Sequence, residues 1–203
     1  MNNSLFLHCC CAPCSVSCVK SLRAEGIEPE LFWYNPNIHP YTEYKSRLGC
    51  LREFAHNMNL ELMMIDEYGL HLFLKEVWQA NFDDNKESRC LKCYKLRLEK
   101  TVFFAVQEGY KAFSTTLLIS PYQNHEAIKL IAEDLASKYG IEFLYRDFRP
   151  LFREGQAEAR SADMYMQKYC GCIFSEEERY EKKITQREKI NFTRRHRDTG
   201  GSL

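Results

Sequence analysis

The sequence lacks the two glycine-rich loops with which many α/β proteins bind phosphate. Neither G-x-G-x-x-G nor G-x-x-x-x-G-K-[ST] occurs in its 203 residues. No apolar run approaches the ~18 residues of a membrane helix. Charge of one sign is not in excess either, because 28 Lys and Arg face 28 Asp and Glu. This balance excludes a global basic field for nucleic acid, although it leaves room for a local basic patch.

The first residues also lack the pattern of an export signal. Met1 to Ser4 contain no basic residue, and the apolar run that follows is shorter than a signal-peptide core. We therefore expect a cytoplasmic protein without a membrane segment.

Short β-type runs alternate with stretches of helical periodicity along most of the chain. The runs predict strands over 4–8, 27–34, 60–65, 112–116 and 141–145. Helices are expected over 16–23 with Ser15 as N-cap, then over 41–59, 70–79, 89–107, from 123 or 124 to 138, and over 156–167. This order predicts one α/β domain over 1–180, with a mainly parallel sheet and helical insertions. A charged helix and tail over 181–203 would follow it.

Ten cysteines stand out against this ordinary pattern. Most of them form three groups, namely Cys9, Cys10, Cys11 and Cys14; Cys90 and Cys93; and Cys170 and Cys172. Clustered thiols in a reducing cytosol bind metal more often than they form disulfides. We therefore favour metal, and we interpret Cys18 and Cys50, which lie alone in helical stretches, as core residues.

The positions of these groups support a metal site. The first group follows strand 4–8, at the edge where open α/β sheets bind ligands. The spacing of Cys90 and Cys93 puts both sulfurs on one face of a helix start, where the helix dipole favours thiolates. A redox dithiol is the alternative for this pair, and the other two groups disfavour it. Gly171 allows a positive φ, which would turn Cys170 and Cys172 inward.

Zinc and iron–sulfur are the two candidate metals. Structural zinc usually pairs C-x-x-C with a second such pair or with histidines, and adjacent Cys10 and Cys11 cannot easily close on one small ion. An iron–sulfur cluster uses cysteine thiolates as its usual ligands. The residues therefore favour iron–sulfur, and seven or more thiols suggest two metals.

Four segments together resemble the QueH family, the cobalamin-independent epoxyqueuosine reductases. The segments are Leu7-His8-x-Cys10-Cys11-Ala12-Pro13-Cys14-Ser15, Arg89-Cys90-x-x-Cys93-Tyr94-x-x-Arg97-Leu98, Thr115-Thr116-Leu117-Leu118-x-Ser120-Pro121-Tyr122-Gln123-x-His125 and Gln167-Lys168-Tyr169-Cys170-Gly171-Cys172-x-Phe174-Ser175. The resemblance implies a fold similar to the adenine-nucleotide α-hydrolase (HUP-like) group. It also implies reductive removal of the epoxide oxygen from epoxyqueuosine at the wobble position of tRNA, which leaves queuosine.

The resemblance further implies a [4Fe–4S] cluster with a second iron close by. Carried onto this chain, the cluster ligands would be Cys10, Cys11, Cys90 and Cys93, and the candidates for the second iron would be Cys14, Cys170 and Cys172. Some members of the family have Asp where this chain has Cys14, so the identity of the second metal stays open. Cys9 is extra to the pattern.

Deoxygenation of an epoxide consumes two electrons and two protons. We expect His8, Tyr122 or His125 to donate a proton, although His8 could equally be a strand-end residue bound to backbone. The electron donor is not identified by the sequence. The basic residues that follow Lys182 either form a solvated face with interleaved glutamates or contact tRNA phosphates.

Two other functions fit a thiol-rich α/β domain. A tRNA sulfurtransferase of the PP-loop type would carry S-G-G-x-D-S after the first strand, where this chain has Cys9 to Ser15. A zinc-dependent nucleic-acid-binding module without catalysis would need only the thiols.

Overall fold

The computed structural model describes residues 4–82, 86–181 and 183. Within these residues, five strands form one sheet in which all neighbouring strands are parallel. The sheet order is β3-β2-β1-β4-β5, with β1 at Ser4–His8, β2 at Glu28–Trp33, β3 at Leu62–Met64, β4 at Ala112–Thr115 and β5 at Glu142–Phe143. The predicted α/β fold with a mainly parallel sheet is confirmed.

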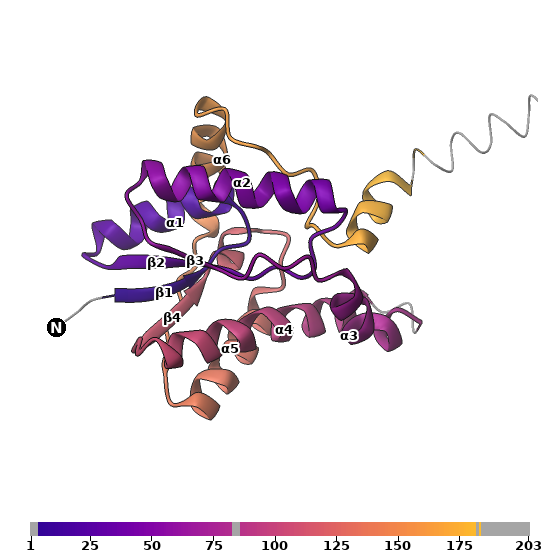
Figure 1. The fold of residues 1–203 in the computed structure, drawn as a ribbon, viewed down its shortest axis with the longest axis horizontal. Helices are drawn as coiled ribbons and strands as arrows, with labels where there is room; N and C mark the ends of the chain where they lie inside the picture. Colours follow the sequence, from indigo (N-terminus) through magenta and orange to yellow (C-terminus); the bar gives the residue numbers. More distant parts are fainter. Residues whose placement is uncertain (1–3, 83–85, 182, 184–203) are drawn as a thin grey trace, which may run out of the picture.

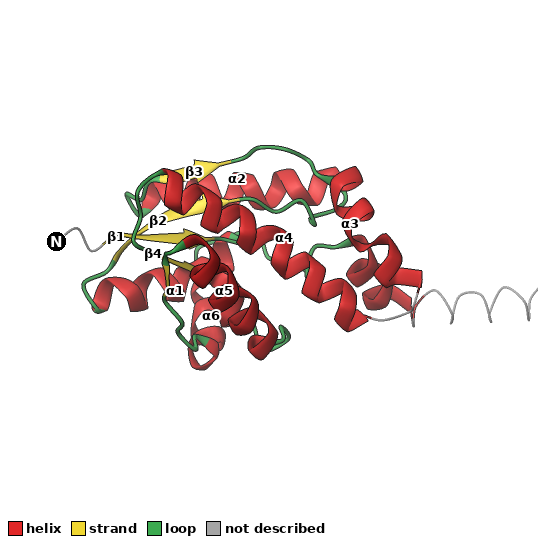
Figure 2. Ribbon diagram, turned by 90° about the horizontal axis from the view of Figure 1, so that it is seen from below, coloured by secondary structure: helices red, strands yellow, loops and turns green. Residues whose placement is uncertain are grey.

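Helices cover both faces of the sheet (Figure 1). On one face lie α1 (Ala12–Ala24), α2 (Tyr41–Asn57) and α6 (Phe152–Ser161). On the other lie α4 (Lys86–Gln107) and α5 (His125–Tyr139), and α3 (Leu70–Phe82) packs against α4. Figure 2 shows that α4 runs beyond the sheet to reach α3. A strand in a sheet that is covered on both faces is buried on both sides, and β1 accordingly carries the buried apolar residues Leu5, Phe6 and Leu7 in succession.

The chain changes its direction of winding between β1 and β4. From β1 the strands proceed outward to β2 and β3, and the chain then crosses back to place β4 on the other side of β1. His8 of β1 aligns with Phe32 of β2 and with Thr115 of β4. Open parallel sheets bind ligands at the carboxyl ends of strands beside such a switch point. Cys9 to Cys11 follow β1 there, and the short 3-10 helix η1 (Thr116–Ile119) follows β4.

Two predicted helices differ from the structure. α1 begins at Ala12 with Cys11 as its N-cap, so Ser15 is not the cap and its hydroxyl instead donates to the carbonyl oxygen of Cys11 at 2.9 Å. The helix expected over 156–167 is α6, which follows a second 3-10 helix, η2 (Arg149–Leu151), and ends at Ser161. Asp163 then adopts a φ of 51°, and residues 164–170 form neither helix nor strand. Contacts with other elements, rather than helical hydrogen bonds, fix the position of this segment.

Smaller differences concern boundaries. α3 continues to Phe82, beyond the predicted end at 79, and α4 begins at Lys86, before the predicted start at 89; residues 83–85 lie outside the described part. β3 and β5 are shorter than predicted, and residues 173–181 are helical, which starts earlier than expected. The predicted tail lies almost wholly outside the described residues, so the division into 1–180 and 181–203 stays a prediction.

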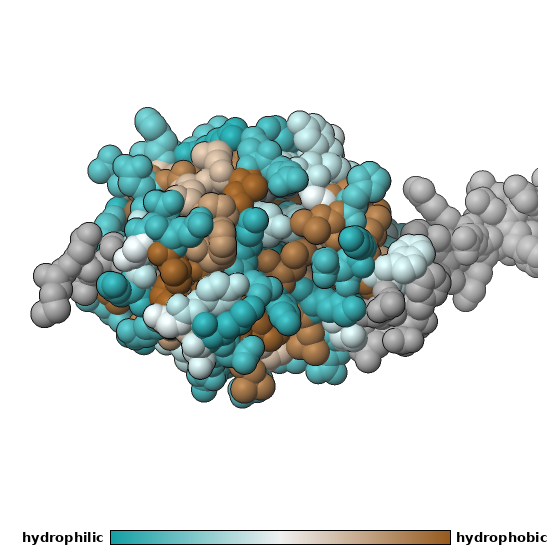
Figure 3. Space-filling view, turned by 60° about the horizontal axis from the view of Figure 1, so that its bottom comes forward, coloured by the Kyte–Doolittle hydropathy of each residue, from teal (hydrophilic) through white to brown (hydrophobic). Residues whose placement is uncertain are grey.

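The surface is mixed in polarity. Figure 3 shows hydrophilic side chains around separate apolar patches on the face that carries α4 and α5. Phe103, Val106 and Leu130 are exposed apolar residues of these two helices. In the part of the chain that is described, no helix has both the length and the apolar character that crossing a membrane requires.

Candidate metal centre

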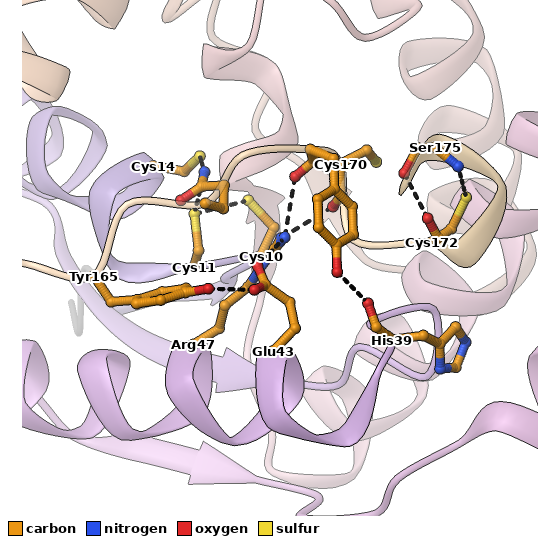
Figure 4. A network of polar contacts seen from close by, with 12 residues as sticks. Cys10, Cys11, Cys14, His39, Glu43, Arg47, Tyr165, Cys170, Cys172 and Ser175 are labelled. Atoms are coloured by element: carbon orange, nitrogen blue, oxygen red, sulfur yellow. Dashed lines mark hydrogen bonds and ion pairs between the residues drawn. The ribbon is translucent and has the colours of Figure 1, made fainter. Parts of the chain in front are cut away.

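Three sulfur atoms meet where the chain passes from β1 into α1. The Sγ atoms of Cys10, Cys11 and Cys14 all lie within 4.8 Å of one another, and 3.9 Å separates those of Cys10 and Cys11 (Figure 4). Cys11 is the N-cap of α1 and Cys14 is the third helical residue, two positions whose side chains face each other at a helix start. We call these three residues the sheet thiols. Among the described residues they are the one group of three or more Cys, His, Asp or Glu side chains at this spacing.

Polar groups from two distant segments hold the sheet thiols. The Thr116 hydroxyl donates to Cys10 Sγ at 3.4 Å and accepts from the Cys10 backbone N–H at 3.1 Å. The Gln167 amide nitrogen donates to Cys11 Sγ at 3.0 Å and to Cys14 Sγ at 3.4 Å. Each sulfur therefore has a donor that would favour its thiolate form.

The three thiols also bond to one another. Hydrogen bonds from Cys11 and Cys14 lower the pKa of Cys10 well below its ordinary value. Burial raises the pKa of Cys11, and the hydrogen bond with Cys10 raises the pKa of Cys14. These shifts favour the thiolate at Cys10 and the thiol at Cys11 and Cys14, and a bound metal would displace the protons of its ligands.

Cys90, Cys93, Cys170 and Cys172 form a second set, which we call the outer thiols. Cys93 and Cys172 are buried and pack in one cluster with Phe73 and Val77 of α3. Burial raises the pKa of Cys90 and of Cys93, and the neighbouring charges of Cys170 and Cys172 raise both pKa values further. The four thiols are thus close enough to interact electrostatically.

The predicted helix-start effect on Cys90 and Cys93 was wrong. Because α4 begins at Lys86, both residues lie beyond its first turn, outside the reach of the helix dipole. Burial instead raises the pKa of Cys93 to about 12.

A buried guanidinium lies between the two sets of thiols. Arg97 of α4 is 1 % exposed, and its Nε donates to the carbonyl oxygen of Cys93 at 3.3 Å. Burial lowers the pKa of Arg97, but the charges of Cys93, Cys170 and Cys10 outweigh it and leave the pKa raised. Its Nη2 atom is buried with no hydrogen-bond partner among the described residues. Such a cation is stable only beside anions, and metal-bound thiolates and sulfide are anions of this kind.

An ion pair of α2 fastens the segment that carries Cys170. Arg47 is 2 % exposed and pairs with Glu43 at 2.6 Å. Its two terminal nitrogens donate to the carbonyl oxygens of Cys170 and Tyr169, both at 3.0 Å (Figure 4). The Tyr165 hydroxyl bonds to the other Glu43 oxygen. A pair of charges from α2 therefore fixes a backbone that has no secondary structure of its own.

The loop after β2 fastens the same segment from another side. The His39 backbone N–H donates to the carbonyl oxygen of Gly171 at 2.8 Å, and the Tyr169 hydroxyl donates to that of His39 at 2.5 Å. Gly171 has a φ of 121°, which confirms the predicted positive φ. A Cβ atom there would lie 3.1 Å from side-chain atoms of Arg47 and Ile38, so crowding adds to the preference for glycine that the positive φ creates.

A cavity of about 840 Å³ opens onto Cys10, Cys14 and Cys170. The charged residues that line it are almost all basic. They are Arg47, Arg97, Arg153, Arg160, Lys168 and Arg179, and the acidic residue among them is Glu178. The chain as a whole has no net charge. The structure thus gathers a local positive field at the thiols, which would attract a polyanion.

The three candidate proton donors occupy different places. His8 is fully buried, with Nδ1 2.9 Å from Thr115 Oγ1 and Nε2 3.3 Å from the Tyr34 carbonyl oxygen, and burial lowers its pKa to about 4. His125 is also buried, with Nε2 3.1 Å from the Ser120 carbonyl oxygen. Neither lines the cavity, whereas Tyr122 does. Proton donation by these residues stays a prediction.

Sequence reasoning missed the supporting residues of the site. Arg47 falls on the apolar stripe of α2, between Tyr44 and Leu48, and Glu43 stands four residues earlier. The sequence feature that could have identified this pair is the presence of two opposite charges, four residues apart, on an otherwise apolar helix face. Gln167 and Arg97 belong to quoted motifs, but their contacts with thiols depend on the tertiary fold.

Comparisons with known proteins agree with this geometry. A family model described as epoxyqueuosine reductase QueH matches residues 5–178. A protein named epoxyqueuosine reductase QueH from Dehalococcoides mccartyi is 38% identical over 182 residues, which cover 90% of this chain and 97% of the relative. One of the same name from Thermotoga maritima is 34% identical over 186 residues, covering 88% and 93%.

The fold is also found among solved structures. One of them is described as a predicted subunit of tRNA methyltransferase from Methanocaldococcus jannaschii, and it matches 76% of this chain and 75% of its own with a TM-score of 0.51 and 15% identity. This likeness supports the predicted fold class and carries no statement about activity.

Proposed function

Since the chain belongs to the QueH family of epoxyqueuosine reductases, we propose that it reduces epoxyqueuosine to queuosine at the wobble position of tRNA. The observation that carries the proposal is the position of the sheet thiols. Their three sulfurs lie at the switch point of the sheet and two of them line a cavity with basic walls.

The donor set fits a [4Fe–4S] cluster with a second iron. A cluster of this type takes four cysteine thiolates, so it requires outer thiols as well as sheet thiols. We assign the cluster to Cys10, Cys11, Cys90 and Cys93, and the second iron to Cys14, Cys170 and Cys172. Cys14 lies within 4.8 Å of Cys10 and Cys11, which would make the two metals neighbours. The unpaired Nη2 of Arg97 would face the added negative charge.

When bound, the cluster would supply electrons one at a time and the second iron would act as a Lewis acid. In the reaction as a whole, two electrons and two protons enter the epoxide. Both C–O bonds break, a C=C bond forms, and the oxygen leaves as water. The electrons come from an external donor whose identity the chain does not specify.

The chain itself would bind and orient the substrate. The cavity volume falls in the range of small-molecule sites, so it can hold a modified base. Its basic walls would contact phosphates of the tRNA. Gln123 accepts a hydrogen bond from the Tyr94 hydroxyl at 2.7 Å and donates to Cys170 Sγ at 3.7 Å, which ties the turn beside the cavity to an outer thiol. Thr116 and Gln167 would orient the metal-binding sulfurs.

The test is a turnover assay under anaerobic conditions. The protein is reconstituted with iron and sulfide, reduced chemically, and incubated with tRNA that carries epoxyqueuosine. Mass spectrometry of the digested nucleosides should show the loss of one oxygen atom. As a control, Cys50→Ala should retain turnover, because Cys50 is a core thiol of α2 outside both sets.

Unchanged epoxyqueuosine in the presence of bound iron and sulfide would contradict the proposal. ATP-dependent transfer of sulfur to tRNA would instead support the sulfurtransferase alternative. Stoichiometric zinc without sulfide would support the binding-module alternative.

A further inference from the structure

Tyr122 presents an unusually exposed aromatic ring beside the thiols. Its side chain is 85 % exposed, more than any other large apolar side chain among the described residues. It nevertheless lines the same cavity as Cys10 and Cys170. A single exposed ring is common on protein surfaces, but this one lines the cavity that opens onto the thiols, where a bound ligand would contact it.

The turn that carries Tyr122 is anchored on both sides. The Tyr122 backbone N–H donates to Ser120 Oγ at 3.3 Å. The Tyr94 hydroxyl accepts from the Asn124 backbone N–H at 3.3 Å, and Asn124 caps α5 by accepting from the Ala127 N–H at 3.0 Å. The ring is therefore exposed on a backbone that is fixed. A ligand that contacts the ring would therefore restrict few additional rotatable bonds of the protein, which keeps the entropy cost of binding low.

The surroundings of the ring are aromatic and cationic. The Phe152 ring lies 6.1 Å from the Tyr122 ring, nearly perpendicular to it at 84°. Arg153, Arg160 and Lys168 line the same cavity and are exposed. Aromatic rings combined with a basic groove are the feature by which proteins bind unpaired nucleotides, because each base can stack and each phosphate can pair with a cation.

We infer that Tyr122 is a stacking residue, whose ring packs against an unpaired base of the tRNA anticodon loop while Arg153, Arg160 and Lys168 contact the flanking phosphates. This inference rests on the proposed function, because it takes tRNA as the substrate. It assigns Tyr122 a positioning role through its ring. Its hydroxyl, which has no hydrogen-bond partner within the described part of the chain, is not required for stacking. Stacking of a neighbouring base would hold the loop while the modified base enters the cavity.

The experiment compares three variants of the iron–sulfur-loaded protein. They are Tyr122→Phe, which keeps the ring, Tyr122→Leu, which removes it, and Tyr41→Leu as a matched control. Tyr41 is 53 % exposed at the start of α2 and does not line the cavity. The probe is a fluorescein-labelled, unmodified RNA hairpin with the anticodon-loop sequence, and binding is followed by fluorescence anisotropy at several salt concentrations.

Tyr122→Leu should weaken binding about tenfold or more, as expected for the loss of one stacked base. Its salt dependence should stay that of the unaltered protein, because no phosphate contact is lost. Tyr122→Phe and Tyr41→Leu should bind the hairpin within about twofold of the unaltered protein, because Tyr122→Phe keeps the ring and Tyr41 lies outside the cavity. Arg153→Gln should reduce the salt dependence.

Wild-type affinity in Tyr122→Leu would overturn the inference. So would Tyr122→Phe that loses RNA binding as Tyr122→Leu does, since the hydroxyl and not the ring would then make the contact. The unaltered protein must also bind the hairpin, and failure to do so overturns the inference. If the binding pattern holds while the unaltered protein leaves epoxyqueuosine intact, the stacking role stands and the proposed reaction fails.

Discussion

The sheet thiols and the segment 164–172, which carries Cys170 and Cys172, are held by two different kinds of structure, and we call this segment the outer half of the site. Cys10 and Cys11 follow the central strand and Cys14 lies in the first turn of α1, so their place follows from the sheet topology. Cys90 and Cys93 likewise lie on a regular element, α4. Cys170 lies in a segment without helix or strand and depends on side chains of α2, above all Arg47. The fold therefore preforms the rest of the site, while a network of individual side chains positions the outer half, and substitutions remote from the thiols should loosen the outer half selectively.

The sharpest test of this division removes ligands one at a time. Cys90→Ala should lose the cluster, its colour and all measurable turnover. Cys14→Ala should keep sulfide and lose the iron in excess of sulfide. Iron and sulfide analysis with Mössbauer spectra distinguishes the two results, and Cys50→Ala serves as the control. A Cys90→Ala protein that stays brown would show that the ligand assignment is incorrect.

Breaking the Arg47–Glu43 pair should loosen the outer half only. Arg47→Leu leaves Glu43 buried and unpaired, so the free energy of unfolding should fall by about 3–5 kcal/mol in urea titrations. Adding Glu43→Leu should recover much of this stability, because the unpaired charge is gone.

A second readout separates stability from positioning. In both variants the segment 164–172 loses the hydrogen bonds from Arg47, so trypsin should cleave faster after Lys168 than in the unaltered protein. Equal cleavage rates would show that Arg47 does not fasten this segment.

Gln167 connects the outer half, segment 164–172, to the sheet thiols. Gln167→Leu removes the donor to Cys11 and Cys14 at nearly constant size, and metal affinity or turnover should fall about 10- to 100-fold. Competition with an iron chelator measures the affinity. Gln156→Leu is a matched control, since Gln156 lines the cavity and its side chain makes no hydrogen bond to a thiol of the described residues. Equal losses in both variants would rule out a specific role for Gln167.

His39 gives the outer half a pH dependence. The ring is fully buried between Tyr68 and Phe73, and burial lowers its pKa from 6.5 to about 4. The unfolded chain therefore takes up a proton between these values and the folded chain does not. Stability from this residue is present above pH 6.5 and declines as the pH falls toward 4.

Between pH 7 and pH 5 the expected contribution is a loss of about 2 kcal/mol in the free energy of unfolding. His39→Phe keeps an aromatic ring at this position and should reduce the loss by that amount. Urea titrations at the two pH values measure it. An identical pH dependence in both proteins would contradict the pKa of His39.

The sequence could predict the half of the site that the fold preforms. Strand 4–8, the helix after it and the thiols between them follow from local patterns, because apolar periodicity and the Cys-Cys-Cys-Ala-Pro-Cys order depend on neighbouring residues. The parallel sheet followed from the alternation of strands and helices.

The other half could not be predicted, because long-range contacts decide it. The expected helix over 156–167 overlooked that residues 164–170 bond to α2 and to the sheet thiols. Nothing local in the sequence ends that helix at Ser161, since no Gly or Pro occurs between Gln156 and Cys170. Arg47 and Gln167 acquire their roles only when segments more than a hundred residues apart meet.

The most direct test of the account is the metal content of the protein purified without oxygen, with iron, sulfide and zinc measured on the sample that gives the optical spectrum. We expect a brown protein with more iron than sulfide, because we propose that a cluster and a separate iron share the seven thiols. A colourless protein that holds zinc, lacks sulfide and stays colourless after reconstitution with iron and sulfide would contradict it.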